Sequence, residues 1–141
     1  MQTIIGSGGT IALPLAKELT KYTNRIRLVS RHPKKVNETD ELFPLDVNNL
    51  SQIDKAVAGS EVGYVTIGFD YNLKVWQQTW PPFMQAVIKA CISHKAKLVF
   101  FDNVYTYAKS AIPHMTEDAP WQPPSKKGAV RKLLNEMIMQ E

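Results

Sequence analysis

Short apolar runs alternate along this chain with stretches whose apolar residues recur at helical spacing. The apolar runs cover residues 3–5, 26–30, 41–47, 62–67 and 97–101, and each is rich in Val, Ile, Leu or Phe. Such runs are typical of buried strands, and helix-forming stretches separate them. The alternation predicts an α/β fold with a doubly wound, Rossmann-like parallel sheet and helices on both faces.

The first two predicted helices follow the first and third strands. The spacing of Ile11, Leu15, Leu19 and Tyr22 predicts the buried stripe of the first helix, with polar residues on its other side. A second helix has its stripe at residues 50–57. Asn48 or Asn49 is a candidate cap for it, and Gly59 is expected at its C-terminal end.

Two further helices are predicted in the second half of the chain. Pro81 and Pro82 suit a first helical turn, so we expect the longer helix to begin near Trp80. Its apolar stripe reaches Cys91, the single cysteine, which we expect to be a buried thiol. A polar loop over about 109–124 precedes the last helix, predicted at 127–139.

A glycine-rich stretch links the first strand to the first helix. It runs Gly6-Ser7-Gly8-Gly9-Thr10-Ile11, so a strand, a glycine turn and a helix follow one another. Glycines let the backbone approach a phosphate closely, and the N-terminus of a helix favours an anion. The stretch therefore indicates a dinucleotide pyrophosphate site, although a tight turn without a ligand would give the same pattern.

The ends of the predicted strands favour the binding interpretation. In a parallel sheet of this kind, ligands bind beyond the carboxyl ends of the strands. Glycine or polar residues stand at all five of these ends: the Gly6 loop, Ser30-Arg31, Asp46-Val47, Thr66-Ile67-Gly68 and Asp102-Asn103. We therefore expect the cofactor to be bound along this edge of the sheet.

Residues after the second strand bear on which cofactor is bound. An NAD-selective site usually has a carboxylate there, which grips the ribose hydroxyls and repels a 2′-phosphate. Here the position holds Ser30, followed by Arg31, with Lys34 and Lys35 close by. A hydroxyl and a planar cation suit a phosphate, so we expect NADP(H), with NAD(H) as the alternative.

Composition narrows the classes of partner. The 141 residues carry 17 basic and 13 acidic side chains, for a net charge of +4, and the basic residues are spread along the chain. No basic stripe with interleaved aromatics suggests nucleic-acid binding, and no Cys/His spacing suggests a metal site. No apolar run has the length of a membrane span, and the N-terminus lacks a signal-peptide pattern. We expect a cytoplasmic protein that binds neither nucleic acid nor membrane.

The ordered set of motifs resembles the extended, epimerase/dehydratase-like branch of the short-chain dehydrogenase/reductase superfamily. The landmarks are Gly6-x-x-Gly9-x-x-Ala12, Leu45-Asp46-Val47, residues 58–62, the strand end at 99–107 and Thr116-Glu117-Asp118-Ala119-Pro120. The resemblance implies that the amides of Gly8 to Ile11 hold the pyrophosphate. It also implies that Asp46 accepts from the adenine amino group and that Ile67 and Gly68 lie along the ribose.

The same resemblance assigns three catalytic positions, and all three are substituted. Asn103 stands where the family has Ser or Thr, Lys127 where it has the acid/base Tyr, and Arg131 where it has the Lys. Lys127 and Arg131 are one helical turn apart and are expected to share a face toward the cofactor. Asn103 can still hydrogen-bond a carbonyl. Lys127 either moves a proton or, like Arg131, binds phosphate or ribose or faces solvent.

We therefore expect residues 1–141 to form one NAD(P)-binding domain of a longer protein whose substrate-binding region is missing here. The predicted function is the cofactor-binding part of an atypical epimerase/dehydratase or reductase. The alternatives are a non-catalytic NADP(H)-binding sensor and an inactive fragment. The substrate is unknown, and the resemblance implies a homodimer through the helices at 80–94 and from 127 onward.

Overall fold

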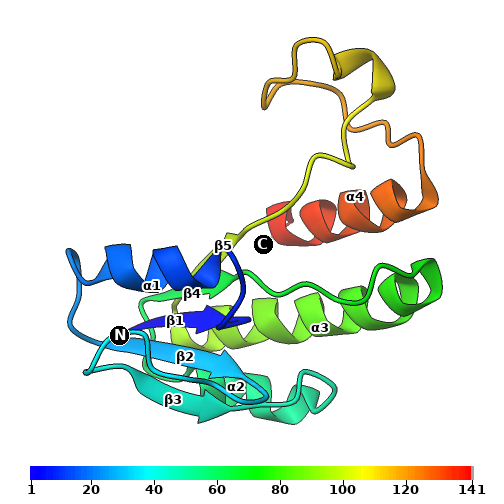
Figure 1. Ribbon diagram of the computed structural model, residues 1–141. Coiled ribbons are helices and arrows are strands. Elements are labelled where there is room, and N and C mark those ends of the chain that lie inside the picture. The colour runs from blue at the N-terminus through cyan, green and yellow to red at the C-terminus, as the bar shows by residue number, and fades with distance from the viewer. Residues whose placement is uncertain (141) are drawn as a thin grey trace. The chain divides into compact units, whose positions relative to one another are not determined.

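The computed structural model describes residues 1–140, and these form two compact units (Figure 1). Residues Met1–Gly68 and Ala86–Phe101 make up the first, which we call the sheet unit. Residues Phe69–Gln85 and the chain from Asp102 onward make up the second unit.

The sheet unit is built on five parallel strands in the order β3-β2-β1-β4-β5. Their bounds are β1 Gln2–Ile5, β2 Ile26–Ser30, β3 Glu41–Pro44, β4 Val62–Val65 and β5 Lys97–Phe100. The chain moves outward from β1 to β3, then returns to β4 on the other side of β1. This order confirms the predicted doubly wound sheet, and it places the switch point between β1 and β4.

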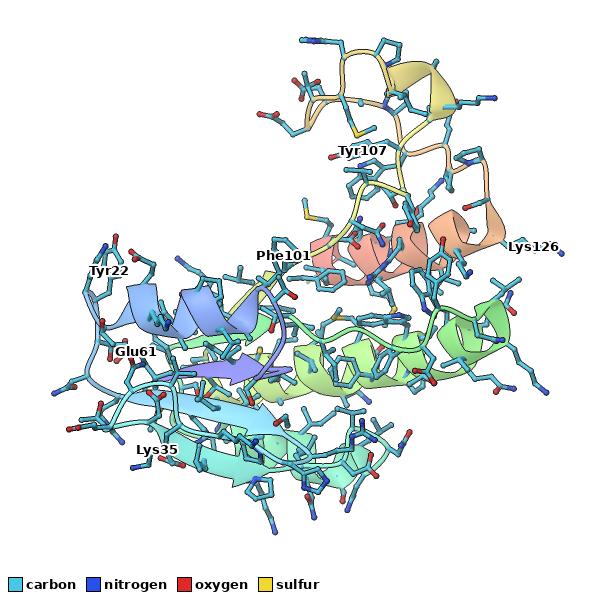
Figure 2. The ribbon with its side chains drawn as sticks, viewed as in Figure 1. Tyr22, Lys35, Glu61, Phe101, Tyr107 and Lys126 are labelled. Carbon is cyan, nitrogen blue, oxygen red and sulfur yellow. The ribbon has the colours of Figure 1, made fainter. Side chains whose placement is uncertain are left out.

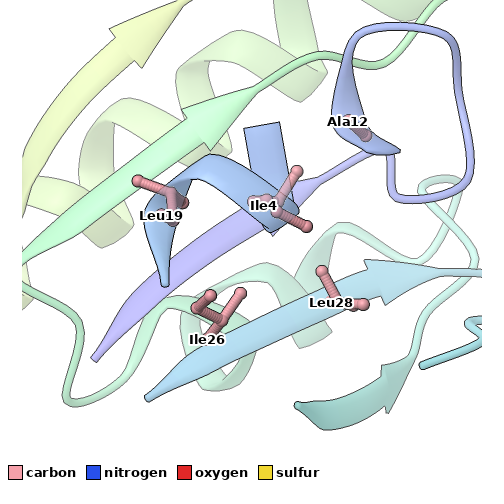
Figure 3. Close-up of a cluster of buried hydrophobic side chains, with 6 residues drawn as sticks. Ile4, Ala12, Leu19, Ile26 and Leu28 are labelled. Carbon is pink, nitrogen blue, oxygen red and sulfur yellow. The ribbon is translucent and has the colours of Figure 1, made fainter. Parts of the chain in front are cut away.

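Helix α1 (Ala12–Leu19) covers one face of the sheet (Figure 3). Its buried residues are Ala12, Ala16 and Leu19, and they pack on Ile4, Ile26 and Leu28. The predicted stripe is wrong in part, because Ile11 is exposed and Tyr22, which is 79% exposed, points away beyond the helix end (Figure 2). The two alanines face the sheet instead, and their small side chains let the helix lie close to it.

The opposite face carries α2 (Ile53–Val57) and the C-terminal part of α3 (Leu73–His94). Arg27 of β2 donates to the carbonyls of Ala56 and Ala58 at 2.7 and 2.9 Å. A Cβ on Gly63 of β4 would lie 3.4 Å from the Cys91 sulfur, so α3 approaches this strand closely. Cys91 is buried as expected, and burial raises the pKa of its thiol to about 11. Helices on both faces are thereby confirmed.

The turns around α2 match the prediction only partly. Gly59 ends the helix with φ +74°, a conformation that favours glycine. A short 3₁₀ turn, η1 (Leu50–Gln52), precedes the helix, and the side chain of Asn49 does not cap it. Asn49 instead accepts a hydrogen bond from the Ser51 hydroxyl at 2.6 Å.

In the second unit, α3 begins at Leu73 and not near Trp80, so the predicted start is wrong. The amide of Val75 donates to the Asn72 side chain at 3.1 Å, and this cap fixes the earlier start. Pro81 and Pro82 consequently lie inside the helix. The unit is completed by η2 (Lys109–Ala111) and by α4 (Lys126–Met139), whose N-terminus is capped by Ser125. The predicted last helix is confirmed to within one residue.

Candidate cofactor-binding and catalytic sites

The glycine loop of the sheet unit crosses the end of β4 at close range. The amides of Gly6 and Ser7 both donate to the Val29 carbonyl of β2, at 2.9 and 3.0 Å. Gly6 has φ +102°, and a Cβ on it would lie 2.5 Å from the Ile67 nitrogen. No other residue type fits here without moving the backbone. The glycine therefore brings the chain past the switch point between β1 and β4.

Beyond this crossing, the loop opens onto the N-terminus of α1. Gly8, Gly9, Thr10 and Ile11 are exposed, and Gly8 has φ +93° with open space where a Cβ would lie. Ile11 provides no side-chain cap, and the first turn of α1 carries no acidic residue. Free amides and the positive end of the helix dipole therefore face this loop, which is the arrangement that binds an anion.

Ser30 and Arg31 lie next to the loop, at the end of β2. The Ser7 hydroxyl donates to the Ser30 hydroxyl at 3.0 Å, so the proton of Ser30 is directed elsewhere. Arg31 is exposed, and within residues 1–140 no acceptor pairs with its guanidinium. The structure thus brings a hydroxyl donor and an uncommitted cation to the strand end that flanks the loop.

Asp46 and Val47 follow β3, and the Leu45 amide before them donates to the Ser30 carbonyl at 2.9 Å. Asp46 is exposed, and its Oδ1 accepts from the backbone and side-chain nitrogens of Asn48 at 3.0 and 2.9 Å. These contacts hold the carboxylate in a turn of the Asx type. Its adenine-binding role stays a prediction.

Thr66, Ile67 and Gly68 follow β4 on the other side of the loop. The Thr66 amide donates to the Ile5 carbonyl at 2.9 Å, and its hydroxyl lies 3.3 Å from the same oxygen. Gly68 is exposed, with nothing near its Cα that would meet a side chain. All the predicted cofactor residues therefore lie at the carboxyl edge of the sheet.

The three predicted catalytic residues lie in the second unit. Asn103 follows β5, and its side-chain oxygen accepts from the Tyr105 amide at 3.0 Å. Lys127 and Arg131 lie in the first half of α4, one turn apart. Both approach the ring of Trp76, so the predicted shared face is present, and its direction toward a cofactor stays a prediction.

Arg131 is buried in an aromatic and acidic environment. Its Nε lies 3.2 Å from Oδ1 of Asp102, and its guanidinium carbon lies 4.3 Å from the Trp80 ring centre and 4.8 Å from that of Trp76. Burial lowers the pKa of Arg131, and the Asp102 charge opposes that shift. Burial also raises the pKa of Asp102, against the amide of Asn103 and the charge of Arg131. These contacts make Arg131 a structural member of the unit.

Lys127 lies above aromatic rings and next to two phenols. Its Nζ is 3.4 Å from the ring centre of Tyr71 and 5.9 Å from that of Trp76, which is cation–π geometry. The Tyr71 hydroxyl donates to the Tyr105 hydroxyl at 3.4 Å, and Tyr105 stacks on Trp76. This hydrogen bond is the main cause that raises the pKa of Tyr105, while the Lys127 charge opposes the shift.

A glycine lets α4 approach the segment that carries Tyr105. A Cβ on Gly128 would collide with the Tyr105 carbonyl oxygen and would lie 2.7 Å from Cβ of Pro123. Gly128 also donates its amide to the Ser125 cap at 3.0 Å. The close approach of backbone to backbone is what brings Lys127 beside the two phenols.

Sequence reasoning missed three residues of this cluster, Tyr71, Trp76 and Asp102. Tyr71 belongs to no motif of the sequence, and Trp76 lies before the predicted start of the helix near Trp80. Asp102 was interpreted as part of a strand end and not as the partner of Arg131. One signal was available. Arg131 has no acidic residue within one helical turn of it in sequence, and a buried arginine needs an acidic partner, which must then come from elsewhere in the chain.

No metal-binding group emerges from residues 1–140, where no three His, Cys, Asp or Glu side chains are grouped to hold an ion. None of the helices in that part of the chain is long and apolar enough to cross a membrane.

The fold and the glycine loop define the Rossmann-like class of α/β domains. No family model and no curated protein matches the sequence. The chain is similar in structure to uronate dehydrogenase from Agrobacterium tumefaciens, with a TM-score of 0.82 and 16% identity over 96% of this chain and 53% of that one.

Two other solved structures extend the likeness. A monomeric L-threonine 3-dehydrogenase from a metagenome has a TM-score of 0.84 and 15% identity, over 99% of this chain and 48% of that one. MoeE5 in complex with UDP-glucose and NAD has a TM-score of 0.79 and 18% identity, over the same shares. At these identities the likeness establishes the fold. The chain spans about half the length of these proteins.

Proposed function

We propose that the sheet unit is the NAD(P)-binding part of an atypical reductase or epimerase/dehydratase of the short-chain dehydrogenase/reductase superfamily. The observation that carries this proposal is the crossing of Gly6 over Ile67, which opens the loop onto the uncapped N-terminus of α1 at the switch point. A dinucleotide pyrophosphate needs close backbone approach and free amides at this point of a doubly wound sheet.

The similar structures support a nicotinamide cofactor. A variant of the uronate dehydrogenase was solved with NAD, and MoeE5 was solved with UDP-glucose and NAD. In our proposal the amides of Gly8 to Ile11 bind the pyrophosphate, and Ile67 and Gly68 line the ribose. Asp46 accepts from the adenine through its outer carboxylate oxygen, since Asn48 occupies the other one.

We further infer that the preferred cofactor is NADP(H). Ser30 accepts from the Ser7 hydroxyl and keeps its own proton for another acceptor, and Arg31 supplies an uncommitted guanidinium beside it. A hydroxyl and a guanidinium together suit a 2′-phosphate, whereas a ribose diol is usually held by a carboxylate at this position.

Titration with NADPH and with NADH, followed by nicotinamide fluorescence, tests both inferences. We expect saturable binding of both, tighter for NADPH. Absence of binding for either dinucleotide would overturn the proposed function. Tighter binding of NADH would overturn the NADP(H) preference alone.

A non-catalytic cofactor-binding protein is the second candidate. The observation that favours it is the buried pairing of Arg131 with Asp102, together with the use of the Asn103 side chain to hold the Tyr105 amide. Two of the three residues that replace the family's catalytic groups, Arg131 and Asn103, therefore already have structural roles.

Turnover separates the two candidates. The protein is incubated with NADP⁺ or NAD⁺ and with glucuronate, L-threonine or UDP-glucose, and reduced nicotinamide or epimer formation is measured. Turnover that falls in Lys127→Ala and Asn103→Ala supports the enzyme and the catalytic roles of both residues. Turnover that is unchanged in both variants removes those roles.

The same preparation, measured by light scattering, tests the proposed homodimer.

A further inference from the structure

In the second unit, several hydrogen-bond donors have no acceptor among residues 1–140. The Lys127 ammonium contacts only aromatic rings, and no carboxylate among residues 1–140 pairs with it. Tyr105 accepts a hydrogen bond from the Tyr71 hydroxyl, so its own phenol proton is free to be donated to another group. Asp102, an acid on the same segment as Tyr105, is engaged by Arg131.

Trp76 and Asn103 add donors to the same cluster. Trp76 touches Tyr71, Tyr105 and Lys127, and it is more than nine-tenths buried. Its indole Nε1 has no hydrogen-bond partner in the described part of the chain. Asn103 uses its oxygen to accept from the Tyr105 amide, and its NH₂ group meets no acceptor there. Of these donors only the Trp76 indole nitrogen is buried, and a buried donor without an acceptor is rare and calls for an explanation.

The electrostatics of α4 point the same way. Its first turn contains Lys126 and Lys127 and no acidic residue. Cations are disfavoured at the N-terminus of a helix, where the dipole is positive. Lys127 is nevertheless held over the Tyr71 ring, half-buried and close to the two phenols. A negative charge bound there would offset the ammonium, the helix dipole and the uncommitted donors together.

We propose that Lys127, Tyr105 and Asn103 form an oxyanion site in the second unit, with Trp76 beneath it, for a carboxylate or phosphate group of a small molecule. Such a group offers only acceptors, which is what a set of donors with one ammonium requires. Tyr71 orients the Tyr105 phenol and holds the ammonium. As a substrate site, this inference rests on the proposed function and names its substrate class as an acid or phosphate ester.

Tryptophan fluorescence is a local probe of this site. The three tryptophans, Trp76, Trp80 and Trp121, all belong to the second unit, and Trp76 is part of the proposed site. The whole protein is titrated with sodium phosphate and, separately, with sodium acetate, at an ionic strength kept constant with sodium chloride. We expect a saturable change with at least one anion, and the comparison tells which group the site prefers.

Two lysine variants make a matched pair. Lys126→Gln and Lys127→Gln remove the same charge from neighbouring positions of one helical turn, and Lys126 lies exposed at the start of α4 (Figure 2). We expect Lys127→Gln to weaken anion binding about tenfold or more, because it removes a charged hydrogen bond. Lys126→Gln should weaken it less than about twofold, and Tyr105→Phe should weaken it several-fold.

Three results would overturn the inference: no saturable change with either anion, equal effects of the two lysine variants, or full binding in Lys127→Gln. Circular dichroism establishes that each variant is folded. A nicotinamide titration of the same samples distinguishes the two proposals. Anion binding without dinucleotide binding would leave this site standing and remove the proposed function, and the reverse result would remove only this site.

Discussion

Asp102 and Arg131 form an ion pair in which Nε lies 3.2 Å from Oδ1, with side chains that are 16% and 8% exposed. The guanidinium also lies over the rings of Trp76 and Trp80. Removing one partner of a buried pair leaves an uncompensated charge, which costs more than the pair itself contributes. The pair therefore makes each partner necessary to the other.

We expect Arg131→Met to lower the free energy of unfolding by about 3–5 kcal/mol, measured by urea denaturation. Methionine keeps contact with the two indoles but leaves the Asp102 carboxylate without its cation. The double variant Asp102→Asn with Arg131→Met should recover part of this loss. Lys132→Met, which removes a partly exposed lysine next in sequence, should change stability by less than about 1 kcal/mol. Equal losses of stability in Arg131→Met and Lys132→Met would contradict the pairing.

The loss in Arg131→Met should depend on pH. Burial raises the pKa of Asp102, so the folded state holds its proton more tightly than the unfolded chain, and stability falls as pH rises through that window. The Arg131 charge lowers the pKa of Asp102. Without that charge the pKa rises further, so the pH range over which stability falls extends to higher pH. The deficit of Arg131→Met should therefore be smallest near about pH 4 and grow toward about pH 7, when urea midpoints are compared. The double variant should lack this trend.

Gly6→Ala should damage the cofactor loop and the fold together. Its Cβ would lie 2.5 Å from the Ile67 nitrogen at φ +102°, so the loop must move away from β4. We expect a loss of at least about 1–3 kcal/mol in unfolding free energy and no measurable NADPH binding. Gly68→Ala, where an added Cβ contacts no other atom, should have the same free energy of unfolding as the parent chain. A Gly6→Ala protein with parent-like stability and affinity would refute the crossing as described.

Arg31→Ala should change cofactor preference without changing stability. The guanidinium is exposed and uncommitted, so its removal costs the fold little. We expect NADPH to bind about tenfold more weakly, through loss of a charged contact, and NADH to bind within about twofold of the parent. Lys35→Ala is the control, since its ammonium donates to the Glu38 carbonyl at 2.7 Å. An equal loss for both dinucleotides would mean that Arg31 does not recognise a 2′-phosphate.

Pro82→Ala should stabilise the protein. Pro82 is exposed inside α3, where proline removes one helical hydrogen bond and crowds the preceding turn. Alanine restores the donor, and the greater freedom of the unfolded chain offsets part of the gain. We expect the free energy of unfolding, measured by thermal or urea denaturation, to increase by about 1–2 kcal/mol. Gln85→Ala in the same helix should have a negligible effect on it. A lower melting temperature would mean that the proline conformation is needed there.

The sheet and the glycine loop could be predicted because their signals are local. Strand β2 has the predicted bounds, 26–30, and Gly6 and Gly8 have the positive φ that a glycine turn implies. The start of α3 could not be placed from the prolines alone. A single side-chain cap at Asn72 and burial of Trp76 and Trp80 outweighed the preference of proline for a first turn.

The cluster around Lys127 lay beyond prediction because its contacts are long-range. Tyr71 and Tyr105 are 34 residues apart in sequence, and their pairing depends on the approach that Gly128 allows. Periodicity within one helix identifies a face, and it does not identify what lies against that face. Arg131 shares a face with Lys127 as predicted, and its acidic and aromatic partners are visible only in the fold.

The passage of α3 from one unit to the other has a consequence for dissecting this protein. The second unit is discontinuous in sequence, and the division between Gln85 and Ala86 falls inside an unbroken helix. Neither unit can therefore be expressed as one continuous segment without part of the other: residues 1–101 hold the sheet unit with Phe69–Gln85 attached, and the chain from Phe69 onward holds the second unit with Ala86–Phe101 attached.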